Sequence, residues 1–271
     1  MMDKIWPIAS ITFKEGIRNR ALQGILSVAG LLCLAYLSVM PMFAFERGKV
    51  IVDLSAASIS LAGLAIVLFL AISMLTRDIH QRSVCMILSR PIPRSSYVVG
   101  KFCGLAFMVF IATLIIAIVA LLTSYVGVRF TGALNAPRNF SIVHMALAYF
   151  LKYVGLVVLL AVAFLFTMLT TNEYLSMLLT MMTYFIGNSL ETIVKVASTG
   201  ADVQLHPIYL IALKVFTWIF PNLSAFDLRI FVAYGIGFPY TQAFWIVAYG
   251  LLYIVTLLSI AIVVFNRKEI L

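Results

Sequence analysis

The sequence predicts an all-α integral membrane protein with six transmembrane helices, and three observations support that class. Hydrophobic residues make up 63% of the 271 residues and charged residues 11%, with a mean hydropathy of +1.10. A soluble domain carries about 25% charged residues, so the few charges here cannot cover a surface that faces water. Apolar runs long enough to cross a bilayer recur along the chain, and basic residues gather in the short segments between them.

A helix needs roughly 20 apolar residues to cross the ~30 Å hydrocarbon core of a bilayer. Six segments meet this requirement, and no internal repeat divides them, so residues 1–271 are predicted to form a single transmembrane domain. The predicted spans lie at about 22–42, 56–76, 102–126, 150–170, 174–194 and 243–265.

The segment before the first span has an apolar residue at every fourth position and a polar row opposite. The apolar row is Ile5, Ala9, Phe13 and Ile17, with Trp6 beside it, and the polar row is Ser10, Lys14 and Arg18. This pattern predicts an amphipathic helix that lies in the membrane interface with its cationic face towards the headgroups. The alternative is an ordinary charged lead-in to the first span.

The distribution of basic residues predicts the orientation, because Lys and Arg are retained on the cytoplasmic side. With the N-terminus inside, the four inner segments (1–21, 77–101, 171–173 and 266–271) carry 11 of the 19 basic residues. The longer outer segments and the span ends carry the other 8. We therefore expect both termini in the cytoplasm of a bacterium and the spans in its inner membrane. The net charge of +9 then reflects topology and not a nucleic-acid partner.

The stretch between the fifth and sixth spans contains a further apolar run, IYLIALKVFTWIF at 208–220. It includes Lys214 and is too short to cross the bilayer, so we expect a short outer helix that is re-entrant or lies on the membrane. "PNLSAFDLR" (221–229) then turns the chain towards the last span.

Two charged positions near the outer span ends deserve a prediction each. Glu191 is the only acidic residue within the six predicted spans, and Lys195 follows it by four residues, the favourable order for a helical ion pair. The pair is either an interfacial salt bridge or part of an outer gate for substrate. Lys152, at the outer end of the fourth span, is expected to extend its ammonium group to the headgroups.

Known catalytic motifs are missing from the sequence. Gly48-Lys49 and Gly100-Lys101 are the only GK pairs, and neither has the glycine five residues earlier that a P-loop requires. The three histidines are isolated, and no metal-ligand spacing or serine-hydrolase elbow occurs. We expect a non-catalytic chain without its own cofactor. The scarcity of intramembrane acids also disfavours a proton-driven carrier.

Residues 77–99 form a basic loop with features beyond a topology signal. A helix continuing from the second span through residue 88 would pair Asp78 with Arg82 and leave an apolar stripe that lipid does not cover. Pro91 and Pro93 would end it, and Ser95 or Ser96 would cap the next helix. Gly100 and Gly104 form a GxxxG pair, which permits close helix contact. The loop is either a plain positive-inside segment or a docking surface for a soluble partner.

Three stretches resemble the type-2 ABC-transporter permeases. "LSRPIPRSSYVVGK" (88–101) is similar to their first cytoplasmic loop, "FKEGIRNR" (13–20) to the elbow helix before their first span, and "IFPNLSAFDLR" (219–229) to the outer segment before the last span in small members. The family loop commonly has Glu and then Gly-Thr where this chain has Asp78, Arg82 and Ser83.

The resemblance implies a six-span permease that pairs with a second copy, each copy receiving one cytoplasmic ABC ATPase that binds ATP and Mg. Residues 77–99 would be the coupling loop that docks on the ATPase, and the N-terminal helix would be the elbow. The residues so implied are Arg77, Asp78, Arg82, Arg90 and Arg94 in the loop, and Trp6, Phe13, Lys14 and Arg18 in the elbow.

The favoured function is therefore the membrane subunit of an ATP-driven exporter. The alternative is a membrane scaffold whose loop recruits a soluble partner for maturation of an envelope protein, without bulk transport. Either function leaves room for a further partner in the periplasm.

Overall fold

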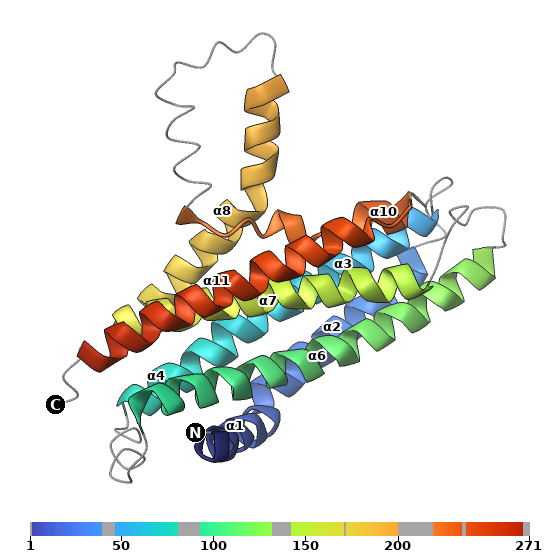
Figure 1. The fold of residues 1–271 in the computed structure, drawn as a ribbon. Coiled ribbons are helices and arrows are strands. Elements are labelled where there is room, and N and C mark those ends of the chain that lie inside the picture. The colour runs from blue at the N-terminus through green and yellow to red at the C-terminus, as the bar shows by residue number, and fades with distance from the viewer. Residues whose placement is uncertain are drawn as a thin grey trace.

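The computed structural model describes residues 2–39, 47–80, 93–131, 142–170, 172–199, 219–234 and 237–267. Within these ranges the regular structure is entirely helical, as the sequence predicts, and the long helices run side by side as a bundle (Figure 1). The helices are α1 (Met2–Ile17), α2 (Arg20–Val39), α3 (Arg47–Ala65), the π-helix η2 (Ile66–Ala71), α4 (Ile72–His80), α6 (Arg94–Thr131), α7 (Ile142–Leu169), α8 (Glu173–Thr199), the 3-10 turn η4 (Ser224–Phe226), α10 (Arg229–Ala233) and α11 (Tyr240–Arg267).

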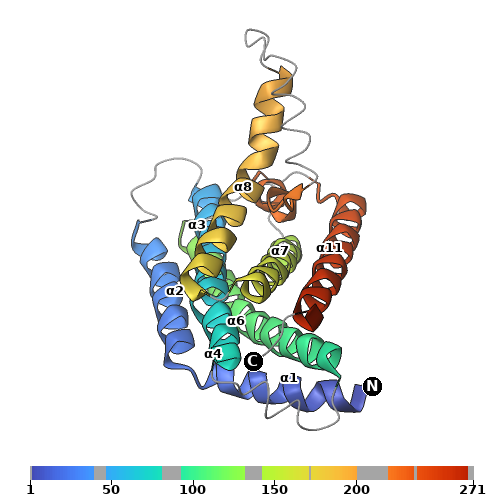
Figure 2. The same ribbon diagram turned by 90° about the vertical axis from the view of Figure 1, so that its left-hand side faces the viewer.

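The long helices alternate in direction between two ends of the bundle. One end, here the α1 end, holds α1, the end of α4, the start of α6 and the last turn of α11 (Figure 1). The other, here the α10 end, holds α10 and the start of α3, α7 and α11. The second half of α8 projects away from the other helices (Figures 1 and 2).

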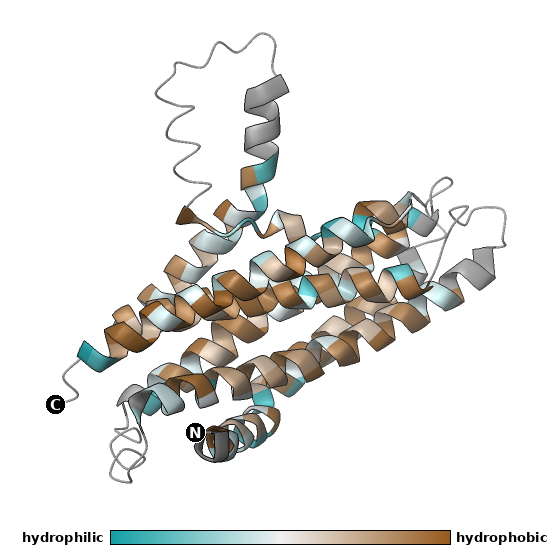
Figure 3. Ribbon diagram, viewed as in Figure 1, coloured by the Kyte–Doolittle hydropathy of each residue, from teal (hydrophilic) through white to brown (hydrophobic). Residues whose placement is uncertain are grey.

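Four helical stretches among the described residues are long and apolar enough to cross a membrane: Val52–Asp78, Ser95–Val126, Ile142–Leu169 and Tyr240–Arg267. They correspond to the second, third, fourth and sixth predicted spans, although the fourth starts at Ile142 and not near residue 150. Figure 3 shows apolar residues along the lengths of these helices and polar residues towards their ends.

The other two predicted spans differ from these four. The first corresponds to α2, whose described part Arg20–Tyr36 is a shorter apolar helix. The fifth corresponds to α8, which is not among the long apolar helices because hydroxyl and amide side chains such as Thr180, Thr183 and Asn188 interrupt its apolar run. The structure thus supports a multi-pass helical membrane protein, and four of the six predicted spans have the expected length and composition.

Helix α7 forms the centre of the bundle, with α3, α6, α8 and α11 packed around it (Figure 2). Its most apolar stretch is 72% buried, whereas that of α11 is only 17% buried. Because α11 is equally apolar but mostly exposed, its outer face must meet lipid or another protein in the membrane. The core is therefore built on α7, and α11 lies at its edge.

Helix α1 crosses the α1 end of the bundle and packs on α6 (Figure 2). The contact depends on two glycines, because an added Cβ at Gly100 would lie 3.0 Å from the Ile5 carbonyl oxygen and one at Gly104 would lie 2.6 Å from the Ala9 carbonyl oxygen. The GxxxG pair therefore does permit close helix contact, as its spacing suggested.

The π-helix η2 is a feature that the sequence did not indicate. It interrupts the span between α3 and α4 at Ile66–Ala71, and five of its six residues are buried. Single π-helical turns are rare and occur frequently at functional sites.

Candidate functional site

Charged and polar side chains gather at both ends of the bundle, and the described residues form two ion pairs at the α1 end. Arg77, in the last turns of α4, pairs with Glu15 of α1, and both side chains are partly exposed. Asp78 pairs with Lys101 of α6, whose side chain is only 6% exposed. The Tyr97 hydroxyl also donates to the same Asp78 oxygen over 3.3 Å. Together these contacts join α1, α4 and α6 into one unit at the base of the predicted coupling loop.

The predicted pairing with Arg82, which lies outside the described residues, stays a prediction for Asp78. Its carboxylate is directed inward to Lys101, because α6 starts beside the end of α4 and offers a cation that is shielded from solvent. Arg82 and Arg90 lie outside the described residues, and α6 begins at Arg94, whose side chain is not described. Of the five predicted docking residues, the structure therefore describes the side chains of Arg77 and Asp78, which lie in the last turns of α4. It places the backbone of Arg94 at the start of α6.

Of the two serines predicted to cap this next helix, Ser96 does not do so through its hydroxyl. The Ser96 and Tyr97 amides donate to the Pro93 carbonyl over 3.0 and 3.4 Å. The Ser96 hydroxyl is buried without a hydrogen-bond partner among the described residues, as is that of Thr76.

The predicted elbow residues divide between the two faces of α1. Trp6 is 76% exposed, and Lys14 and Arg18 are also exposed. Phe13 packs against the ring of Phe107 on α6, with a centroid distance of 4.7 Å. One face of α1 is thus fixed on the bundle, while Trp6 and Lys14 of α1 and Arg18 just after it are exposed, as an interfacial helix requires.

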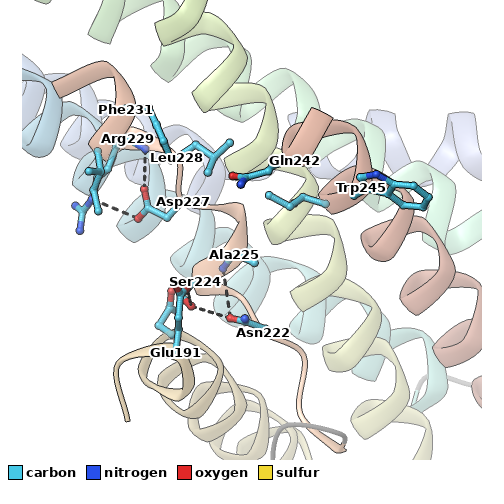
Figure 4. Close-up of a pocket in the computed structure, with 13 residues that line it drawn as sticks. Glu191, Asn222, Ser224, Ala225, Asp227, Leu228, Arg229, Phe231, Gln242 and Trp245 are labelled. Carbon is cyan, nitrogen blue, oxygen red and sulfur yellow. Dashed lines mark hydrogen bonds and ion pairs between the residues drawn. The ribbon is translucent and has the colours of Figure 1, made fainter. Parts of the chain in front are cut away.

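At the α10 end, a cavity of about 850 Å³ lies between α8, the segment before α10, and the start of α11 (Figure 4). Its volume is in the range of small-molecule sites in proteins. Its polar lining comes from all three elements, and the apolar lining comes mainly from α10 and α11. The polar lining residues are Asn188, Glu191, Asn222, Ser224, Asp227, Arg229 and Gln242.

Glu191 lies on the wall of this cavity, where the Ser224 hydroxyl donates to its carboxylate over 2.8 Å (Figure 4). The Lys195 side chain is not described, so the predicted Glu191–Lys195 pair stays a prediction. The contact with Ser224 places the second half of α8 and residue 224 at the same end of the bundle. The 208–220 helix predicted between them lies outside the described residues, apart from its last two residues.

A line of alternating charges runs beside the cavity. Lys152 of α7 donates to Asp227 over 2.7 Å, and Arg229 lies 3.4 Å from the same Asp227 oxygen. Arg229 also lies 3.8 Å from Asp53 of α3. The line therefore connects α7, the segment before α10, α10 itself and α3.

The prediction that Lys152 extends to the headgroups is wrong, because its side chain is only 14% exposed and is paired with Asp227. A lysine within an apolar helix is costly and marks a functional position, so Lys152 itself could have been selected from the sequence. Its partner could not, since Asp227 is 75 residues away.

Among the described residues, no group of three or more His, Cys, Asp or Glu side chains is placed to hold a metal ion. The sites at both ends consist of ion pairs, amides and hydroxyls, which bind or position other groups and include no activated nucleophile. The fold and these sites define a multi-pass helical membrane protein with charged assemblies at its two ends.

The family model of the ABC-2 family transporter protein matches residues 6–270, nearly the whole chain. The chain belongs to this family, which confirms the resemblance seen in the sequence. It is accordingly the non-catalytic transmembrane component of an ABC transporter, the kind that pairs with an ABC ATPase. No curated protein matches the chain.

Proposed function

We propose that the chain is the permease of an ABC exporter in the inner membrane of a bacterium. A separate cytoplasmic ATPase would bind ATP and Mg, and its hydrolysis cycle would drive movement of a substrate through the membrane. The chain would cross the bilayer six times through α2, α3–α4, α6, α7, α8 and α11, with the α1 end in the cytoplasm. The alternating helix directions and the basic residues of residues 1–21 and 77–101 support this orientation.

The observation that carries the proposal is the assembly of α1, α4 and α6 at the α1 end. A loop that transmits force to the spans needs a base that moves with them, and residues 81–92 are flanked by two helices whose ends are joined by the Asp78–Lys101 pair. The Arg77–Glu15 pair adds α1 to that base. Within the loop 77–99, Arg82, Arg90 and Arg94 would contact the ATPase, and Asp78 would hold the loop's base in position.

A second copy of the chain would complete the transporter, forming a homodimer with one ATPase on each permease. The exposed apolar faces of α8 and α11 support a partner within the membrane, because residues such as Met182, Phe185 and Leu252 are more than half exposed.

The experiment is affinity purification of the tagged permease from its native membrane, without nucleotide and with ATP or ADP. We expect a P-loop ATPase to co-purify and its rate of ATP hydrolysis to change when the permease is reconstituted with it in nanodiscs. A permease that yields no P-loop ATPase under any nucleotide condition would contradict the proposal. A stable soluble partner without a P-loop would instead support the scaffold function.

A further inference from the structure

The segment Pro221–Ala233 closes the α10 end of the bundle, although it contains only a 3-10 turn and a five-residue helix. Two tethers fix its first part. The Leu223 amide donates to the Gly187 carbonyl of α8 over 3.1 Å, and the Asn222 amide donates to the Tyr249 hydroxyl of α11 over 3.2 Å. Because the segment has so little regular structure of its own, its position depends on contacts with the surrounding helices.

The middle of the segment is held by a buried aromatic side chain. Phe226 is 0% exposed and sits in a notch between α7 and α11 that two glycines create. An added Cβ at Gly155 would lie 3.1 Å from the Phe226 Cβ, and one at Gly250 would lie 3.0 Å from the Phe226 ring and 3.0 Å from Val154. Phe226 and Val154 therefore pack side by side against Gly250 of α11.

The residue next to Phe226 makes the ionic contact. Asp227 accepts from Lys152 over 2.7 Å, and it also lines the cavity of about 850 Å³. Burying two opposite charges adds little net stability, because lost hydration offsets their attraction, but it does fix one geometry. If the segment lifts, water from the cavity reaches the Asp227 carboxylate, which already lines it. The Lys152–Asp227 pair thus fixes one geometry when the segment is closed, and water can replace this contact when the segment is open.

We propose that Lys152 and Asp227 are positioning residues that hold Pro221–Ala233 closed against the first half of α7, as the latch of an outer gate. The outer position of the gate rests on the proposed function, which places the α10 end outside the cytoplasm. The latch itself does not depend on that function. Arg229 and Asp53 extend the line of charges to α3 at longer distances of 3.4 and 3.8 Å and act as a secondary contact.

The test is thiol labelling of the purified permease in nanodiscs, in a background with Cys33, Cys85 and Cys103 replaced by alanine. Val154→Cys reports exposure of the site beside Phe226, and Gln242→Cys, on the cavity wall but in α11, is the matched control. Each probe is placed in the native background, in Lys152→Arg, which keeps the ion pair, and in the double variant Lys152→Met/Asp227→Asn, which removes both charges together. Nanodiscs expose both faces, so the result depends neither on orientation nor on an ATPase.

We expect the labelling rate at Val154→Cys to rise at least about tenfold in the double variant, because local opening sets the rate of modification of a covered site. The rate should be unchanged in Lys152→Arg, and Gln242→Cys should react similarly in all three backgrounds. Equal protection of Val154→Cys in every background would overturn the latch. So would loss of the double variant from the membrane, since the pair would then be needed for folding itself.

Discussion

Lys101 shows how a single charged residue can serve the fold and the proposed coupling together. It is 5% exposed, and it is the most buried charged side chain whose burial the structure describes. Its partner Asp78 is also held by Tyr97, so the carboxylate stands in an ordered, largely dry environment at the base of the loop. Arg77, one residue earlier, makes its ion pair with Glu15 at the surface.

This difference in burial predicts different costs for removing each cation. Lys101→Met leaves the Asp78 carboxylate buried without its cation, a change that costs about 3–5 kcal/mol in comparable sites. Arg77→Met removes a surface pair worth about 0–1 kcal/mol. Thermal unfolding of the detergent-purified permease should therefore show a large drop in Tm for Lys101→Met and a small one for Arg77→Met. Equal shifts in the two variants would show that Asp78 is well hydrated and that this pair does not fix the loop.

At the scale of elements, the docking of α1 on α6 joins the N-terminal helix to the bundle. The two backbones approach closely where Gly100 and Gly104 face Ile5 and Ala9. Thr12, which is 1% exposed, and Gly16 continue the buried face of α1. The helix that the sequence identifies as interfacial is thus bound to the third predicted span and would follow its movement.

The glycine contact predicts that Gly104→Ala weakens the docking of α1. Its Cβ would lie 2.6 Å from a backbone oxygen, which no rotamer change can relieve, and such overpacking costs about 1–3 kcal/mol. Gly24→Ala on α2 is the matched control, since no heavy atom lies within 4 Å of its added Cβ and alanine favours a helix by about 1 kcal/mol. Tm and limited proteolysis within residues 1–20 report both effects. If Gly104→Ala keeps α1 protected and leaves Tm unchanged, the close approach has no energetic role.

The elements differ in how far the sequence predicted them. Length and hydropathy predicted the long helices because lipid imposes one requirement on every span. They could not predict the π-helix at Ile66–Ala71, since its extra residue per turn depends on packing against α7 and not on composition. The span in α8 was predicted from its length. Its apolar run is interrupted by hydroxyl side chains such as those of Thr180 and Thr183, which face the bundle and donate to carbonyls four residues earlier.

At the scale of the whole molecule, the sites were harder to predict than the spans. Local spacing suggested Asp78–Arg82 and Glu191–Lys195, because only neighbours along one helix can be read from a single sequence. Arg82 and the side chain of Lys195 are not described, so both pairs stay predictions. The structure also pairs Asp78 with Lys101 and Lys152 with Asp227, contacts that exist only after the helices pack. The exposure of Lys14 and Arg18 was easier to predict, since a polar face follows directly from helical periodicity. Trp6, which the pattern placed beside the apolar row, is exposed as well.

The proposed function joins the two ends into one mechanism. The ATPase would act on the loop at the α1 end, the long helices would carry the movement, and the segment held by Lys152 and Asp227 would respond at the α10 end. The central claim is that the loop 77–99 docks on an ABC ATPase. A substitution at Arg82 tests this docking most directly.

The measurement that tests the claim is co-purification of the ATPase with permease carrying Arg82→Glu, using Arg138→Glu on the opposite predicted side as the matched control. A contact at the centre of an interface is worth about 2 kcal/mol or more, which exceeds the ~0.2–0.5 kcal/mol of a helical surface pair. We predict that Arg82→Glu loses the ATPase and ATP-dependent activity while its yield and Tm match those of the native permease, and that Arg138→Glu retains both. A well-folded Arg82→Glu permease that keeps its ATPase in full would contradict the account.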